Sequence, residues 1–307
     1  MRKTAFMDNT DFRPHNFLSL PRKFSEFESS EFVILPVPYE QTTTFQVGTK
    51  KGPQAIINAS KEVETFDEEL KQETSKVGIH TLEEMEITAK GPDKMVEKVY
   101  KIAKELVDMN KRVVLLGGEH TTSIGMVKAL SENYKNLSVL QLDAHADLRD
   151  SYQESKYSHA CTMRRIGEIA PFVGVGIRNL SLEEYEFVQK KKIDLFFAKE
   201  LMKEDSWMDQ VLSKLSENVY LTMDLDFFDP SIMPAVGTPE PGGLLWNQTL
   251  DLLKKVAYNK NIVSFDCVEL CPIPGLVAPD FLAAKLIYKI IGYIVSKEGR
   301  ICPNLDP

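Results

Sequence analysis

Cysteine is scarce in this chain of 307 residues, which contains four. Cys267 and Cys271 stand close together, but no second pair of cysteines or histidines lies near them to complete a zinc site. Cys161 and Cys302 are isolated from each other. This usage excludes a disulfide framework, and we expect reduced thiols in a cytoplasmic protein.

Long apolar runs and an excess of basic charge are also missing. Residues 1–8 are not followed by the apolar core of a signal peptide. Residues 281–295 are apolar, but the stretch is too short for a membrane span and contains Lys285 and Lys289, so it predicts an amphipathic or buried helix. The formal charge is −8, with 45 acidic against 37 basic residues, which disfavours nucleic acid as a partner. We therefore expect neither a membrane nor a nucleic-acid partner.

Histidine is rare as well, yet its positions are informative. Only five histidines occur, and three lie between residues 120 and 159. Three apolar runs predict strands, and each is followed by metal-ligating residue types: Gly117-Gly-Glu-His120, Asp143-Ala-His145-Ala-Asp147 and Asp224-Leu-Asp226. If the chain stays extended there, residues two apart project to the same side. We expect three adjacent strand ends to bring these side chains together.

Charged groups at the ends of buried strands are rarely left without a partner. A pair of divalent cations is the economical partner, and such a pair indicates metal-assisted hydrolysis. Carboxylates outnumber imidazoles and no cysteine lies in the motifs, which favours Mn²⁺ over thiolate-bound Zn²⁺. The candidate ligands are His120, Asp143, His145, Asp147, Asp224 and Asp226.

Each motif also has a plainer interpretation when it is taken alone. An Asp-x-Asp is commonly a turn or a solvated loop, and Gly-Gly-Glu-His could be a helix-entry turn with Glu119 at the helix start. Their joint occurrence, each after an apolar strand, favours the metal site.

The apolar runs alternate with segments of helical period. Residues 92–110 have apolar residues at helical spacing, and a further helix is expected to begin at Pro53. Strands are expected at 32–37, 113–116, 137–142, 172–177, 219–223 and 262–268. This alternation predicts an α/β fold, a single three-layer αβα domain with a mostly parallel sheet, in which ligands bind beyond the carboxyl ends of the strands. Residues 31–307 would form the catalytic domain and residues 1–30 an N-terminal arm or subunit contact.

On these motifs the chain resembles the ureohydrolase family of arginases and agmatinases, and is most similar to agmatinases. The shared segments are Gly-Gly-Asp/Glu-His at 117–120, Asp-Ala-His-x-Asp at 143–147, Ser-His-Gly/Ala at 158–160, and Asp-x-Asp-x-x-Asp-Pro at 224–230 with Gly-Thr-Pro-Glu-x-Gly-Gly at 237–243. The resemblance covers the chain from about residue 30. It implies an arginase-like fold and a homo-oligomer, either a trimer or a hexamer.

The resemblance also implies two Mn²⁺ per subunit, with Asp143 and Asp224 bridging them and a shared hydroxide attacking a guanidinium carbon. Asp147 would pass a proton to the leaving amine, and Glu269 would pair with the guanidinium. His159 would be a proton shuttle, as a solvent-facing imidazole near the mouth of the site. Without the resemblance, His159 would be a surface loop histidine and Glu269 a structural carboxylate.

The substrate implied is a small cationic guanidine. Residues 158–164 are similar to the agmatinase form Ser-His-x-x-x-x-Arg, so agmatine, giving putrescine and urea, is expected first. N1-aminopropylagmatine, giving spermidine and urea, is the alternative. Guanidino acids stay open because Arg149, Arg164 and Arg165 lie nearby. Glu119 departs from the more widespread Asp beside the metal histidine. Two rivals from other classes are a non-catalytic metal-binding homologue and a deacetylase with a single zinc ion.

Overall fold

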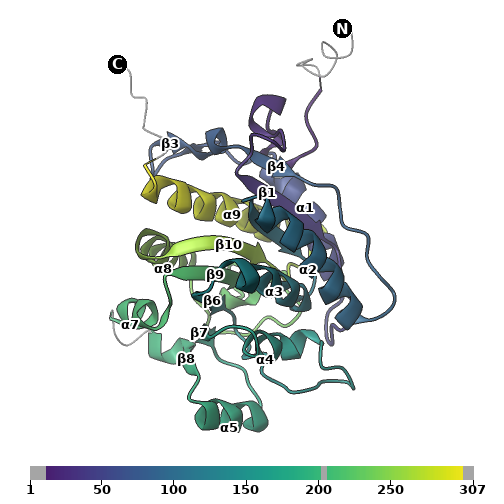
Figure 1. Ribbon diagram of the computed structural model, residues 1–307, viewed down its shortest axis with the longest axis vertical. Coiled ribbons are helices and arrows are strands. Elements are labelled where there is room, and N and C mark those ends of the chain that lie inside the picture. The colour runs from purple at the N-terminus through teal and green to yellow at the C-terminus, as the bar shows by residue number, and fades with distance from the viewer. Residues whose placement is uncertain (1–11, 202–205, 300–307) are drawn as a thin grey trace.

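A computed structural model describes residues 12–201 and 206–299. An eight-stranded sheet forms its centre, in the order β4-β1-β5-β10-β9-β6-β7-β8 (Figure 1). Every strand pairing described in this sheet is parallel, as the sequence predicts. The strands are β1 Phe32–Val37, β4 Ile79–Thr81, β5 Arg112–Gly117, β6 Leu137–Leu142, β7 Phe172–Ile177, β8 Asp194–Phe197, β9 Asn218–Met223 and β10 Asn261–Cys267.

Two layers of helices cover the sheet. On one side α1 and α8 pack against α9, and α7 packs against α8; on the other side α3 packs between α2 and α4. The predicted three-layer αβα arrangement is therefore confirmed. The helices are α1 Gly52–Ser60, α2 Pro92–Asp108, α3 Ser123–Asn133, α4 Thr162–Ile166, α5 Leu182–Lys191, α6 Ala198–Leu201, α7 Trp207–Lys214, α8 Trp246–Asn259 and α9 Ala278–Lys297.

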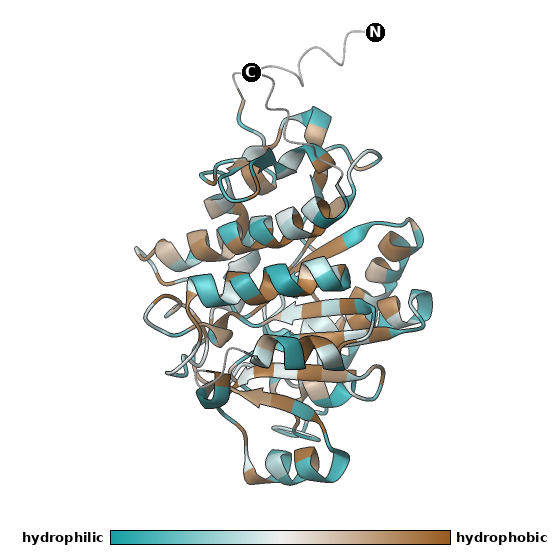
Figure 2. Cartoon of the chain, turned by 90° about the vertical axis from the view of Figure 1, so that its left-hand side faces the viewer, coloured by the Kyte–Doolittle hydropathy of each residue, from teal (hydrophilic) through white to brown (hydrophobic). Residues whose placement is uncertain are grey.

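The strands are mostly apolar on both sides because both faces of the sheet are buried. In β1, Phe32 and Ile34 belong to the core beneath α1, α8 and α9. Val33 and Leu35, which alternate with them, belong to the core beneath α2 and α3. Figure 2 shows the strands mostly brown between helices that alternate between brown and teal. Parallel sheets with two covered faces have this pattern.

The position of β10 corrects one expectation. The strand ends after 113–116, 137–142 and 219–223 were expected to be adjacent, but β10 lies between β5 and β9. In a parallel sheet each connection crosses over through a helix, so order along the chain does not fix order in the sheet. The sequence also did not predict β4, β8 or the small hairpin of β2 (Phe66–Asp67) and β3 (Gln72–Glu73), which are two to four residues long.

The described part of the N-terminal segment packs on the domain. Phe17, Leu18 and Leu20 are buried in the core that contains α1 and α9. The Leu18 N–H donates to the Ser60 hydroxyl oxygen at 2.8 Å. Residues 12–30 thus form part of the same packed body.

The described residues include three of the four cysteines and the whole apolar stretch 281–295. Cys161, Cys267 and Cys271 are buried free thiols, whereas Cys302 lies outside the described residues. The apolar stretch 281–295 is the greater part of the buried helix α9. Within residues 12–201 and 206–299, no helix has the length and apolar character needed to cross a membrane.

Candidate metal centre

The predicted site residues, the metal ligands together with Glu269, lie at the carboxyl ends of the four central strands. His120 follows β5, Asp143 follows β6, Asp224 follows β9 and Glu269 follows β10. Since all four strands are parallel, their carboxyl ends meet at one edge of the sheet. The sequence motifs, distant along the chain, therefore converge.

The first group of ligands surrounds the Nδ1 atom of His120. That nitrogen lies 3.1 Å from Oδ2 of Asp147, 3.3 Å from Oδ2 of Asp143 and 3.4 Å from Oδ2 of Asp224. It is buried and makes no hydrogen bond to any described residue. One imidazole nitrogen facing three carboxylate oxygens is a donor set that fits a divalent cation.

A second group shares one member with the first. Asp143, His145 and Asp226 offer ligand atoms within 4.8 Å of one another, as do His120, Asp143 and Asp147. The Nδ1 atom of His145 lies 2.8 Å from Oδ2 of Asp226. A carboxylate common to two groups can bridge two ions. The structure thus brings all six predicted ligands together around Asp143.

Burial and like charge perturb the acids of this cluster in the metal-free protein. Burial, together with the carboxylates of Asp226 and Asp147, raises the pKa of Asp143 to about 7. Burial, followed by the charges of Asp226 and Asp143, raises the pKa of Asp224 well above its ordinary value. Crowded buried carboxylates favour either bound protons or a bound cation.

The imidazole of His145 responds to the same charges. Burial lowers its pKa, but the carboxylates of Asp226 and Asp143 outweigh this and raise it to about 10. The pKa of Asp226 falls to about 2 because His145 outweighs the effect of burial. In the metal-free protein this pair is therefore an ion pair that a metal would have to replace.

The orientation of His120 is set by residues that the sequence analysis missed. Its Nε2 atom lies 2.8 Å from the hydroxyl oxygen of Thr222, which in turn donates to Oδ1 of Asp266 at 2.9 Å. Partners of this kind fix the tautomer of a metal-binding histidine. The available signal was a polar side chain near the carboxyl end of each of two mostly apolar strands, β9 and β10.

The backbone at two site residues corrects the expectation of an extended chain. Asp147 has a φ of 52° and Glu269 a φ of 65°, both in the left-handed region that residues other than glycine seldom adopt. Asp226 lies in a short 3₁₀ helix, Leu225–Phe227. Strained backbone of this kind clusters at functional sites. The side chains converge through turns rather than through continued strand geometry.

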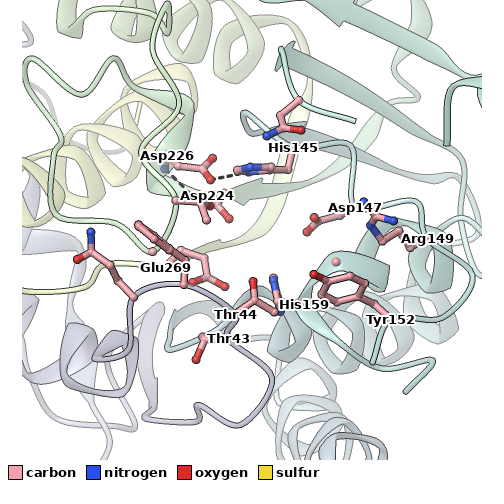
Figure 3. Close-up of a pocket in the computed structure, with 16 residues that line it drawn as sticks. Thr43, Thr44, His145, Asp147, Arg149, Tyr152, His159, Asp224, Asp226 and Glu269 are labelled. Carbon is pink, nitrogen blue, oxygen red and sulfur yellow. Dashed lines mark hydrogen bonds and ion pairs between the residues drawn. The ribbon is translucent and has the colours of Figure 1, made fainter. Parts of the chain in front are cut away.

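A cleft opens over the cluster. Figure 3 shows Asp147, His159 and Glu269 extending toward a common space from separate loops, with Thr43 and Thr44 along one side. His120 and Asp143 lie deeper and are almost completely buried. Residues 148–157 form turns and supply Arg149 and Tyr152 to the wall of the cleft.

One carboxylate oxygen of Glu269 is held by a hydrogen bond, and the residue also lines the cleft. Its Oε1 atom accepts the backbone N–H of His120 at 2.8 Å. Burial raises its pKa well above the ordinary value, although the hydrogen bond from His120 opposes this. The carboxylate thus has a structural contact and also lines the cleft, and its pairing with a guanidinium stays a prediction.

His159 is not the solvent-facing imidazole that was expected. The residue is half-buried, with Nδ1 3.1 Å from the hydroxyl oxygen of Thr42, and its ring packs edge-on to that of Tyr152 at 6.2 Å between centroids. Burial lowers its pKa below the ordinary value, while the charge of Asp147 opposes this. Burial therefore favours the neutral form of this imidazole.

A family model, curated relatives and solved structures all relate this chain to the arginase family. The model of the arginase family matches residues 30–292. The N(1)-aminopropylagmatine ureohydrolase of Synechocystis sp. is 37% identical over 294 residues, covering 91% of this chain and 96% of that protein. The agmatinase of Pyrococcus horikoshii is 32% identical over 270 residues, covering 87% and 93%. The crystal structure of agmatine ureohydrolase from Thermoplasma volcanium superimposes with a TM-score of 0.86 at 29% identity, covering 94% and 97%. The chain belongs to the arginase family, as its motifs predict.

Proposed function

We propose that this protein is an agmatinase-type ureohydrolase, which hydrolyses the guanidinium group of a small cationic guanidino amine to urea and an amine. The observation that carries this proposal is the carboxylate of Glu269, which lines the same cleft as the His and Asp cluster. A carboxylate is the natural partner of a planar guanidinium cation. A guanidinium paired with Glu269 would lie in the cleft next to the His and Asp cluster.

The proposed cofactor is a pair of Mn²⁺ ions. The oxygen-rich donor set and the two groups that share Asp143 support two hard or borderline cations. Such a pair supplies Lewis-acid activation of water. The ions would be held by His120, Asp143, His145, Asp147, Asp224 and Asp226.

The chain's own residues would bind the substrate and move protons. Glu269 would pair with the guanidinium while the His120 N–H holds its other oxygen in place. Asp147, at the wall of the cleft, would accept a proton and pass it to the leaving amine. His159, whose pKa is lowered by burial, would exchange protons between the cleft and solvent.

The arginines around the cleft favour an amine over an acid as substrate. Arg149 lines the cleft, but its guanidinium lies 5.0 Å from the centre of the Tyr152 ring, and its Nε atom is 4.0 Å from Glu184. Arg164 stacks on Phe187. Arg165 is 2.9 Å from the Asp150 carboxylate. These engaged cations are poorly placed to receive a substrate carboxylate.

Two guanidino amines fit this chemistry. The motifs predict agmatine first, whereas the higher identity to an N(1)-aminopropylagmatine ureohydrolase supports the aminopropyl derivative as the first candidate. Both substrates carry the guanidinium on an unbranched amine. Their products would be putrescine and spermidine, respectively.

The test is urea release by the Mn²⁺-loaded protein from agmatine, aminopropylagmatine, arginine and guanidinobutyrate in parallel. We expect one of the two guanidino amines to exceed both acids in kcat/KM. Preference for arginine or guanidinobutyrate would overturn the choice of substrate class. The trimer or hexamer, the cytoplasmic location and the division at residue 31 stay predictions.

A further inference from the structure

The segment 38–44, which follows β1, is held tightly on the turn that carries His120. The Gly118 N–H donates to the carbonyl of Val37, and the Glu119 N–H donates to the carbonyl of Tyr39, both at 2.9 Å. A Cβ atom on Gly118 would lie 2.0 Å from the Tyr39 oxygen, so only glycine allows this approach. The two segments therefore have a fixed relative position, and Thr43 and Thr44 in the first line the cleft.

Glu119 is fully buried but contributes to neither of the ligand groups around Asp143. Its Oε2 atom accepts the backbone N–H groups of Gln41 at 2.8 Å and of Thr42 at 2.7 Å. Its Oε1 atom accepts the hydroxyl of Thr42 at 3.0 Å. The carboxylate thus takes three hydrogen bonds from the segment, and one of them uses the only hydroxyl proton of Thr42.

This bond determines what Thr42 can offer to His159. A hydroxyl has one proton to donate and two lone pairs. With the proton directed at Glu119, the oxygen can only accept, and it accepts the backbone N–H of His159 at 2.9 Å. The Nδ1 atom of His159 lies 3.1 Å from the same oxygen, so it must carry a hydrogen to make a favourable contact.

The second polar neighbour of Nδ1 does not change this outcome. The Ser158 hydroxyl oxygen lies 3.4 Å from Nδ1, farther than that of Thr42. A serine hydroxyl can rotate to donate or to accept, so Ser158 is compatible with either tautomer. The ionised carboxylate of Glu119 cannot adapt in this way, because it has no proton to donate: Oε2 accepts two backbone N–H groups and Oε1 accepts the Thr42 hydroxyl.

We propose that Glu119, acting through Thr42, holds His159 in the Nδ1–H tautomer and leaves the lone pair of Nε2 available at the cleft. Both are positioning residues, and their effect on turnover rests on the proposed function of His159 as a proton shuttle. With Nδ1 held as a donor, the shuttle accepts and releases its proton at Nε2, on the side of the ring away from Thr42. Glu119 and Thr42 together form a hydrogen-bond relay, which keeps Nδ1 of His159 a donor throughout that cycle.

The direct test is the tautomer of His159 in the full-length protein. The protein would be labelled with ¹⁵N-histidine and loaded with diamagnetic Mg²⁺, and long-range ¹H–¹⁵N correlation spectra would be recorded near pH 8. The chain has only five histidines, and His159→Gln would identify the signal. We expect protonated Nδ1 and unprotonated Nε2. Protonated Nε2, or a mixture of tautomers, in the unmodified protein would overturn the proposal.

Three variants test the direction of the relay. In Glu119→Gln the amide oxygen can still accept the backbone donors while its NH₂ group donates to Thr42, so the hydroxyl proton must turn to His159 and protonation should move to Nε2. Thr42→Val removes the hydroxyl and should give a mixture of tautomers, whereas Thr42→Ser, the matched control, should keep Nδ1–H. An unchanged tautomer in both Glu119→Gln and Thr42→Val would contradict the relay.

Kinetics then connect the tautomer to turnover. With Mn²⁺ content equal across the set, we expect kcat to fall about tenfold in Glu119→Gln and Thr42→Val, with little change in KM. The basic limb of the pH profile should move to lower pH in Glu119→Gln, because a protonated Nδ1 would face a hydroxyl proton. Thr42→Ser should keep both the kcat and the pH profile of the unmodified protein. If no guanidine is hydrolysed, the proposed function fails while the spectrum still decides the tautomer.

Discussion

The Nδ1 atom of His120 lies 3.3 Å from Oδ2 of Asp143, although the strands that carry these residues, β5 and β6, are separated in the sheet by β10 and β9. The turns that follow β5 and β6 bring the two side chains together over the ends of the strands between them. Metal ligands therefore come from three of the four central strand ends, and the fourth supplies Glu269. A metal bound here would tie together three segments between residues 120 and 226 that come from different strands, so metal binding should also stabilise the fold.

The first prediction is that the loss of one ligand affects metal binding and activity together. Asp226→Ala removes the partner of His145 and should lower metal content and activity together. The loss of metal affinity should exceed the roughly 10–100-fold cost of losing an outer-shell partner. Metal per chain by plasma mass spectrometry and urea release would be measured on the same samples.

Asp229→Asn is the control for this variant. Asp229 belongs to the same motif, but its oxygens accept the N–H groups of Ser231 and Gly242 and lie outside the two ligand groups. It should keep its metal. Full activity of Asp226→Ala with one ion bound would contradict a two-ion site.

Metal binding should release protons and weaken as the pH falls. In the metal-free protein the pKa of Asp143 is raised to about 7 and that of His145 to about 10, so both bind protons at pH 6 and only His145 does at pH 8. A cation must displace these protons. Calorimetry with Mn²⁺ in buffers of different ionisation enthalpy should show more protons released at pH 6 than at pH 8, with lower affinity. Equal affinity at both values, without proton release, would be inconsistent with these residues as ligands.

Glu269→Gln should separate substrate binding from metal binding. Glutamine can still accept the His120 N–H, so the fold of the turn and the metal content should be retained. The loss of a charge-assisted bond, about 1.5–3 kcal/mol, corresponds to a fall in kcat/KM of about 10- to 150-fold. Urea release under saturating Mn²⁺ would measure it, and unchanged turnover would give Glu269 a structural role only.

Lys289 should contribute to stability without affecting the site. This lysine of α9 is buried and lies 2.8 Å from the fully buried carboxylate of Asp67 in the β2–β3 hairpin. Lys289→Met leaves that carboxylate without its nearest cation and should cost about 3–5 kcal/mol of unfolding free energy. Adding Asp67→Asn should recover most of this loss. Urea unfolding would be compared with Lys285→Met, a partly exposed ion pair on the same helix, for which we expect a change within about 1 kcal/mol.

The sequence predicted the main elements because their signals are local. The strand now described as Phe32–Val37 and the helix Pro92–Asp108 agree with the predicted positions to within two residues. Their apolar residues have the period that burial of each element requires. Short elements such as β4 and β8 carry too few residues for a period to be visible.

Residue types and their places at strand ends were likewise determined by the sequence alone, because an apolar strand followed by Asp, His or Glu is a local pattern. The tertiary structure decided the rest. It inserted β10 between β5 and β9, turned Asp147 to a positive φ, covered His159, and gave Thr42 a hydroxyl bond to Glu119. Each of these depends on contacts between segments far apart in the chain, which only the packing of the whole domain selects.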